Sequence, residues 1–74
     1  MYYTQRMKDL REDEKINQKE IARAINIDQR TYSRYELGIN KMPIDLLIKL
    51  CKFYNVSPEY ILGFTNTKKP LPKE

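Results

Sequence analysis

Four polar side chains surround two tyrosines near the middle of the chain. The polar residues are Gln29, Arg30, Ser33 and Arg34. If this segment is a helix with Tyr32 and Tyr35 facing inward, the polar side chains must face outward. Arginine pairs with guanine edges and glutamine with adenine edges, each through two hydrogen bonds. The outward face of this segment therefore has the chemistry needed to read base pairs in DNA.

The flanking residues predict how this segment is held in place. Within residues 18–37, Ile21 and Ile25 are apolar at a four-residue step, and Ala22 is small where a crossing helix must come close. Ile27 is placed to fill the turn between the two helices. These features are typical of two short helices that cross at a tight turn, which is the arrangement of a DNA-reading helix-turn-helix.

The ends of both helices carry recognisable capping residues. Asn17 is followed three residues later by Glu20, which predicts a capping box at the start of the first helix of the pair. Asn26 is expected to hold the turn in a left-handed conformation, which asparagine tolerates better than most residues. Asp28 is a second N-cap, and Gly38 is placed to end the second helix as a left-handed cap.

The whole chain predicts a compact all-α domain of five helices without a convincing strand. We expect the helices at residues 4–14, 18–25, 29–37, 43–54 and 59–62. The fourth segment is apolar on most sides and is expected to be the central buried element. Prolines and lysines after Thr65 predict a flexible basic tail over residues 65–74, which leaves residues 1–64 as the folded domain.

Composition favours a nucleic-acid partner and argues against an enzyme. A chain of 74 residues forms one domain at most and has no room for a cleft between domains. The formal net charge is +4 and the isoelectric point is about 9.3, in the range of nucleic-acid-binding domains. Residues 15–41, which include the helix-turn-helix, carry six basic and three acidic residues.

Residues for metal, cofactor or nucleophile chemistry are scarce. The chain has no histidine and one cysteine, so neither a metal cluster nor an activated serine is expected, and no cofactor is implied. The two glycines are helix stops and form no phosphate loop. Cys51 is expected in the core, and a lone cysteine favours a reducing compartment. Without a signal peptide or an apolar run of about 20 residues, we expect a soluble, cytoplasmic protein.

Five segments together resemble a known family. They are LRE at 10–12, NQKEIA at 17–22, TYSRYELG at 31–38, LIKL at 47–50 and VSPEYILG at 56–63. Over about residues 7–63 the chain resembles the Cro/C1-type (XRE family) helix-turn-helix regulators, whose DNA-binding domains are phage-repressor-like. It departs from their pattern at Asn26, where glycine is usual, and at Ile39, where a polar or basic residue is usual.

The resemblance implies a role for several residues. Gln18 would bind a DNA phosphate and brace the second helix of the motif, although it can also be read as a simple first-turn residue. The further phosphate contacts would be Lys19, Asn40 and Lys41. Arg11 and Glu36 would form a structural ion pair between the first and third helices. The base contacts would be Gln29, Arg30, Ser33 and Arg34.

The resulting hypothesis is a sequence-specific transcriptional repressor that binds a double-stranded DNA operator as a homodimer. Candidate dimer contacts are Phe53, Pro58, Ile61 and Phe64, although Ile61 fits equally well as a core residue. Two alternatives remain open. The basic side chains of the third helix could be no more than a solvated face. The same fold could also serve as an antitoxin or other protein-interaction module.

Overall fold

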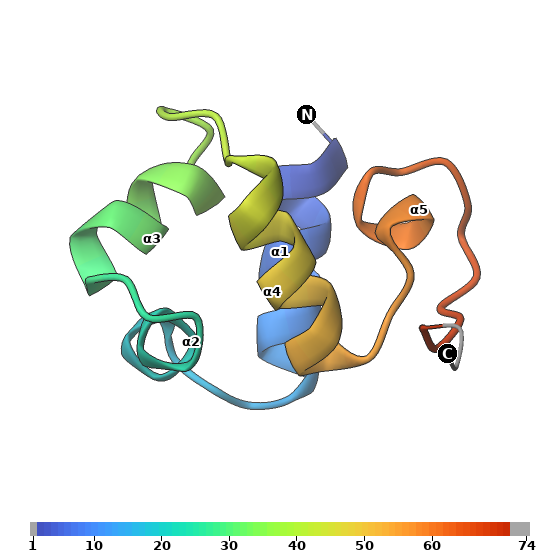
Figure 1. Ribbon diagram of the computed structural model, residues 1–74, viewed down its shortest axis with the longest axis horizontal. Coiled ribbons are helices and arrows are strands. Elements are labelled where there is room, and N and C mark those ends of the chain that lie inside the picture. The colour runs from blue at the N-terminus through green and yellow to red at the C-terminus, as the bar shows by residue number, and fades with distance from the viewer. Residues whose placement is uncertain (1, 72–74) are drawn as a thin grey trace.

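The computed structural model describes residues 2–71 and contains helices without strands in that range. The helices are α1 (Tyr2–Asp13), α2 (Gln18–Ala24), α3 (Gln29–Glu36), α4 (Ile44–Tyr54) and α5 (Pro58–Ile61) (Figure 1). This confirms the predicted all-α class and the five helices. The predicted bounds of the first helix differ most, because α1 begins two residues earlier.

The helix-turn-helix lies at one end of the molecule. In Figure 1, α2 and α3 occupy the left side, α1 and α4 form the middle, and α5 lies on the right with the chain after it. Helix α1 packs against both α3 and α5. The described chain measures 31 × 24 × 23 Å along its principal axes, so the motif presents a whole end of the domain to solvent.

A single apolar core joins the helices. Its largest fully buried side chains are Met7, Ile21, Ile25, Tyr32, Leu50, Cys51 and Ile61. Burial of a large apolar side chain stabilises the fold by about 1.5–3 kcal/mol. Cys51 is therefore a core residue, as predicted. Ile61 is also wholly buried and cannot contribute to a dimer surface, so that part of the predicted dimer set is wrong.

The capping predictions are confirmed by the backbone. The Asn17 side chain accepts a hydrogen bond from the Glu20 amide at 2.8 Å, and Glu20 accepts one from the Asn17 amide at 3.3 Å. Asn26 has φ +63° in the turn between the helices. Asp28 accepts from the Thr31 amide at 2.8 Å and so caps α3. These caps satisfy donors that would otherwise lack partners at the two helix starts.

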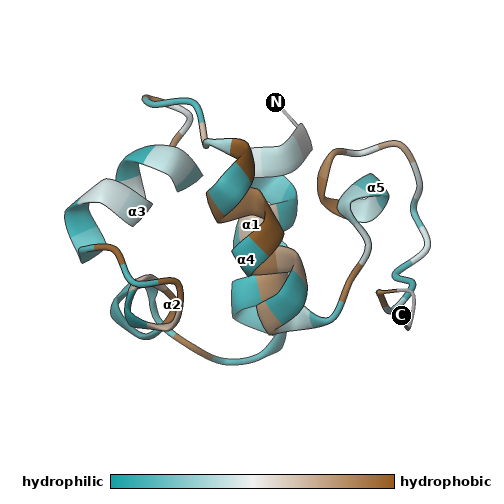
Figure 2. Cartoon of the chain, viewed as in Figure 1, coloured by the Kyte–Doolittle hydropathy of each residue, from teal (hydrophilic) through white to brown (hydrophobic). Residues whose placement is uncertain are grey.

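Helix α4 is less buried than its sequence indicates. Only one side of it, including Leu50 and Tyr54, enters the core, whereas Ile44 is 72% exposed. Pro43 precedes the helix as its N-cap residue instead of forming its first turn. Apolar and polar residues alternate around α4 in Figure 2. A domain of this size has too few residues to cover a helix on every side, so α4 packs against the core with one side and exposes the other.

The chain after α5 folds back onto the domain. Arg6 donates to the Asn66 side chain at 2.7 Å, and Lys68 pairs with Asp13 at 2.6 Å. Leu71 is partly buried against the core. Residues 65–71 therefore lie against α1, which offers the Arg6 guanidinium as a donor and the Asp13 carboxylate as a charged partner. The flexibility of this tail stays a prediction. Residues 72–74 lie outside the described range.

Candidate nucleic-acid interface

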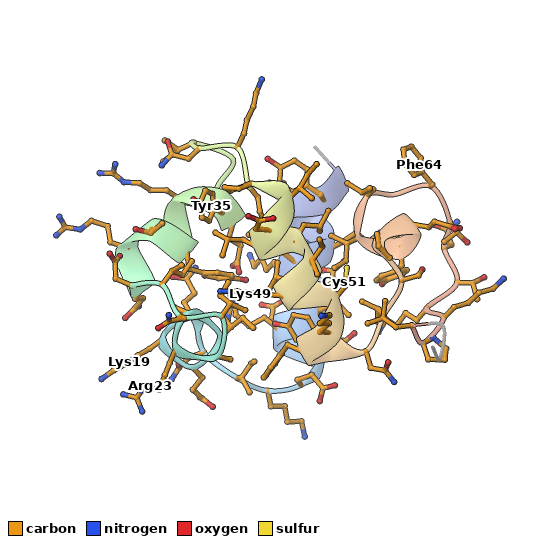
Figure 3. All side chains as sticks on the ribbon, viewed as in Figure 1. Lys19, Arg23, Tyr35, Lys49, Cys51 and Phe64 are labelled. Atoms are coloured by element: carbon orange, nitrogen blue, oxygen red, sulfur yellow. The ribbon has the colours of Figure 1, made fainter. Side chains whose placement is uncertain are left out.

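Helix α3 has a buried side and an exposed side. Tyr32 is completely buried and Tyr35 packs against the core, and Figure 3 labels Tyr35 at the side of α3 that faces α4. Gln29, Arg30 and Arg34 are exposed on the other side of the helix. This is the orientation that the tyrosine spacing predicts, since residues three and four apart share one face.

The exposed side of α3 borders a shallow groove of about 510 Å³, called here the reading groove. Its lining residues are Gln18, Gln29, Arg30, Ser33, Arg34, Leu37 and Ile39. The structure therefore brings the four predicted base contacts together with Gln18, which comes from the start of α2. Two exposed apolar side chains, Leu37 and Ile39, complete the lining, and the sequence prediction assigned neither of them to the site.

Two of the other three predicted phosphate contacts lie next to the reading groove. Lys19 lines a neighbouring hollow that also includes Gln29, so it sits beside the first residue of α3. The amide of Asn40 donates to the Arg34 carbonyl at 3.3 Å, which ties the loop after α3 to the helix end. Lys41 does not line the reading groove, because the loop has by then turned toward α1 and α4.

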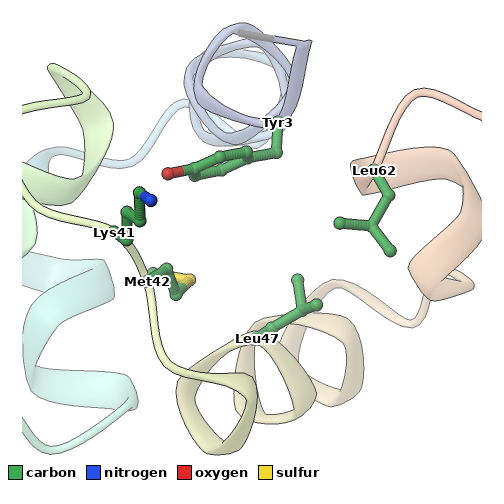
Figure 4. Close-up of a pocket in the computed structure, with 5 residues that line it drawn as sticks. All are labelled: Tyr3, Lys41, Met42, Leu47 and Leu62. Atoms are coloured by element: carbon green, nitrogen blue, oxygen red, sulfur yellow. The ribbon is translucent and has the colours of Figure 1, made fainter.

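Lys41 instead lines a separate apolar groove of about 240 Å³. The other lining residues are Tyr3, Met42, Leu47 and Leu62. In Figure 4 the Tyr3 ring, Leu47 and Leu62 surround one open space from three different segments of the chain. The Tyr3 hydroxyl is buried without a hydrogen-bond partner in the structure. This groove, called here the apolar groove, is chemically unlike the reading groove.

Two cations near the interface were missed by sequence reasoning. Arg23 shares the hollow that contains Lys19, and both point to solvent from α2 in Figure 3. Lys19 and Arg23 are four residues apart and so lie on the same side of α2, and this spacing could have identified Arg23 as a second cation beside Lys19. Lys8 lies in a polar hollow with Gln18 and Glu36. No local pattern identifies Lys8, because its position depends on how α1 packs against α3.

Arg11 and Glu36 form an ion pair that connects α1 to the end of α3. Arg11 donates from Nε to Glu36 Oε2 at 3.0 Å and from Nη2 to Oε1 at 2.9 Å. The buried Tyr32 hydroxyl donates to Oε2 at 2.6 Å. Gln18 Nε2 donates to Oε1 at 3.3 Å. One carboxylate thereby joins α1, the start of α2 and the middle of α3.

The electrostatics of this network favour the charged carboxylate. Burial alone would raise the pKa of Glu36, but hydrogen bonds from Arg11, Tyr32 and Gln18 outweigh it, so the pKa is lowered. The hydrogen bond to Glu36 raises the pKa of Arg11. Burial, together with the bond to Glu36, raises the pKa of the Tyr32 hydroxyl far above its usual value. All three groups therefore keep a single charge state over the physiological range.

Gln18 can serve this network and a DNA phosphate at once. A side-chain amide nitrogen carries two hydrogens, and only one is needed for the bond to Glu36. Gln18 also lines the reading groove, so its side chain is held at the edge of the surface that would meet DNA. The bracing role is thus a feature of the structure, while the phosphate role stays a prediction.

Comparison with known proteins identifies the family. A family model described as "Helix-turn-helix" matches residues 7–61. The chain belongs to the XRE (Cro/C1-type) helix-turn-helix family. The match spans α2 and α3, the α1 residue Arg11 and the core residues of α4 and α5, so it confirms the resemblance found in the sequence.

Three relatives illustrate the range of this family. The HTH-type transcriptional regulator YobD of Bacillus subtilis is 38% identical over 92% of this chain and 61% of its own length. The cryptic phage CTXphi transcriptional repressor RstR of Vibrio cholerae is 35% identical over 73% of this chain and 49% of its length. The antitoxin PezA of Streptococcus pneumoniae is 32% identical over 88% of this chain and 41% of its length. The chain therefore spans roughly half the length of these relatives.

No solved structure matches the chain significantly. Within residues 2–71, no helix has the length and apolar character needed to cross a membrane. The same part of the chain contains no group of three or more side chains suited to hold a metal ion.

Proposed function

We propose that this protein binds double-stranded DNA sequence-specifically and represses transcription. The observation that carries the proposal is the reading groove, where the exposed side of α3 gathers Gln29, Arg30, Ser33 and Arg34 beside the start of α2. The N-terminal half of α3 would enter the major groove, as recognition helices do. A regulator of this kind acts in the cytoplasm on chromosomal or phage DNA and needs no catalytic residue or cofactor.

Positioning on DNA and reading of bases fall to different residues. Gln18, Lys19, Asn40 and Lys41 would contact phosphates, and the four α3 residues would contact base edges. Arg23, exposed beside Lys19, adds a fifth candidate for the phosphate set. Repression follows from occupancy alone, because a protein bound across a promoter excludes polymerase.

We propose further that the protein acts as a homodimer. One α3 reaches only a few base pairs, which is too little to single out a site in a genome, and two copies double the contacts. Phe64 is 79% exposed and points outward at the end of the domain opposite α3 in Figure 3. Pro58 and Phe53 are also exposed. The apolar groove that Leu62 lines at the end of α5 is a further apolar area, and exposed apolar areas mark interaction sites.

Selection from random duplex DNA followed by sedimentation tests both parts. We expect a pseudo-palindromic site with half-sites about 10–10.5 base pairs apart, the spacing of two recognition helices about 34–36 Å apart. The saturated complex should contain two chains, and Phe64→Ser should lower the stoichiometry at low protein concentration. Failure to enrich any sequence would refute DNA reading. An asymmetric site bound by one chain would refute only the dimer.

The similarity to PezA favours a second candidate, a protein-binding antitoxin. In that case the exposed apolar residues beyond α4 would bind a partner protein instead of a second copy. The candidates differ in what the isolated chain does. A repressor binds its operator without a partner, whereas DNA binding that appears only when a partner protein is added would support the antitoxin.

A further inference from the structure

Two apolar side chains in the reading groove are largely exposed to solvent. Leu37 is 70% exposed and Ile39 is 66% exposed. Single exposed apolar residues are common on protein surfaces and need no explanation. These two, however, line the same groove as all four predicted base contacts. The groove therefore has an apolar end as well as a polar one.

The helix end fixes the position of Ile39. The Gly38 amide donates to the Tyr35 carbonyl at 3.1 Å, and the Ile39 amide donates to the Arg34 carbonyl at 2.9 Å. This pair of bonds is a Schellman motif, which Gly38 permits with φ +79°. An apolar residue after such a cap commonly packs against its own helix. Ile39 stays largely exposed instead, so the cap holds it beside Arg34 with its side chain available.

Leu37 continues the row of residues that faces the groove. Gln29, Ser33 and Leu37 follow at four-residue steps and therefore share one side of α3. The Leu37 amide donates to the Ser33 carbonyl at 2.9 Å, so Leu37 is one helical turn beyond Ser33. The row thus passes from an amide through a hydroxyl to a branched aliphatic side chain.

We propose that Leu37 and Ile39 contact the C5-methyl group of a thymine, and that each operator half-site contains this thymine at the end of the sequence read by α3. The proposal rests on the DNA-binding function proposed above and names a specificity determinant within it. In the major groove, the thymine methyl is the apolar group that base pairs display. A phosphate at the same place would lose water without gaining a hydrogen bond from either side chain.

This assignment also explains why the end of the reading groove differs from the family pattern. A polar or basic residue at position 39 would suit the DNA backbone, whereas isoleucine offers it nothing. The polar backbone contacts then come from other residues, among them Gln18, which also lines the groove, and Lys19 in the neighbouring hollow. The apolar end is free to discriminate thymine from cytosine, whose C5 carries no methyl group.

Replacement of thymine by deoxyuridine tests the proposal, because it removes the methyl group and leaves every hydrogen-bonding group in place. Each thymine of the selected operator would be replaced in turn, in both half-sites, and the affinity measured by fluorescence anisotropy. We expect one position per half-site to lose about fourfold in affinity, which is the factor for one buried methyl-sized group at about 0.8 kcal/mol.

Protein variants then assign the effect to the two side chains. Leu37→Ser and Ile39→Ser should each bring the thymine-to-deoxyuridine ratio at that position close to one, while Ile44→Ser should leave it at about fourfold. Ile44 is a matched control because it is 72% exposed and does not line the reading groove. All three residues are exposed, and a thermal melt of each variant verifies that it is folded.

Three results would overturn the proposal. Equal affinity for the parent operator and every deoxyuridine operator would show that no methyl group is read. A loss on Leu37→Ser or Ile39→Ser that is the same for both kinds of operator would indicate contact with the sugar-phosphate backbone. A fourfold effect that persists in both variants would assign the methyl contact to other residues. Failure to select any operator is a different result and would refute the DNA-binding function itself.

Discussion

Removal of the buried Glu36 carboxylate should destabilise the domain more than removal of one partner of an exposed ion pair. Glu36→Ala deprives Arg11 of two hydrogen bonds, and it deprives the Tyr32 hydroxyl and the Gln18 amide of their acceptor. Tyr32 is fully buried, so its hydroxyl cannot turn to water. The variant therefore leaves a buried donor and a poorly solvated cation without partners.

The expected loss follows from the burial of the pair. Breaking a fully buried ion pair costs about 3–5 kcal/mol. The side chains here are 15% exposed for Arg11 and 5% for Glu36, and Arg11 keeps its bond to the Ile16 carbonyl at 3.2 Å. We therefore expect a loss of about 2–4 kcal/mol in the free energy of unfolding, which includes the unpaired hydroxyl. For a domain of this size the melting temperature should fall by at least about 8 °C.

Thermal and urea unfolding followed by circular dichroism would measure this loss. The pair formed by Lys68 and Asp13 provides a matched control, because its side chains are 46% and 57% exposed at a distance of 2.6 Å. Lys68→Ala should cost at most about 1 kcal/mol, as exposed pairs do. If Glu36→Ala and Lys68→Ala melted within about 2 °C of each other, the reasoning from burial would be wrong.

Three further predictions follow. Gln29→Ala and Arg34→Ala should each weaken binding to the selected operator by about 1–3 kcal/mol for each lost base contact, with unchanged melting temperatures; equal operator affinities would refute their role. Lys19→Ala should reduce the slope of log affinity against log salt by about 1, and an unchanged slope would exclude a phosphate contact. Because the folded-state pKa of Glu36 lies below its usual value of 4.5, its contribution is present above that pH and is lost as the pH falls through the lowered pKa. The difference in unfolding free energy between the parent and Glu36→Gln should therefore shrink on acidification, and a difference independent of pH would contradict the charged network.

The local structure of this chain was predictable because it depends on neighbouring residues. Asn17 and Glu20 lie three apart and cap the same helix start, and Asp28 caps the next one through its own side chain. Asn26 and Gly38 have positive φ values where the two turns require them. Each of these features needs at most a few residues of context, so the sequence contains all the information that determines it.

The burial of a side chain was predictable only where the helical spacing of apolar residues alone determines which side faces the core. The spacing of Tyr32 and Tyr35 predicted the inner side of α3, since a short amphipathic helix has one core to face. The apolar pattern of α4 did not reveal that Ile44 is exposed, because that depends on which helices happen to cover each side. The same holds for Ile61, whose apolar chemistry suits a core and an interface equally well until the packing of α5 is known.

The reading groove shows the same division between local and tertiary information. Gln29, Arg30, Ser33 and Arg34 were predictable from the helix period, and they lie together as expected. Ile39 was recognised as a departure from the family pattern, but the direction in which its side chain points could not be predicted from the neighbouring residues. Only the cap that follows α3 places it in the groove, since two backbone hydrogen bonds turn the chain back toward Arg34.

The network around Glu36 links the stability of the domain to the placement of its reading helix. The carboxylate is reached from α1 by Arg11, from α2 by Gln18 and from within α3 by Tyr32. A helix of eight residues such as α3 is too short to be stable in water without tertiary contacts. Its orientation must therefore come from the surrounding structure, and a buried charge with four hydrogen bonds tolerates little displacement because each bond depends on direction. Arg34 and Ser33 lie within three residues of Glu36, so their positions in the reading groove depend on a network whose members Arg11 and Tyr32 are not themselves proposed DNA contacts.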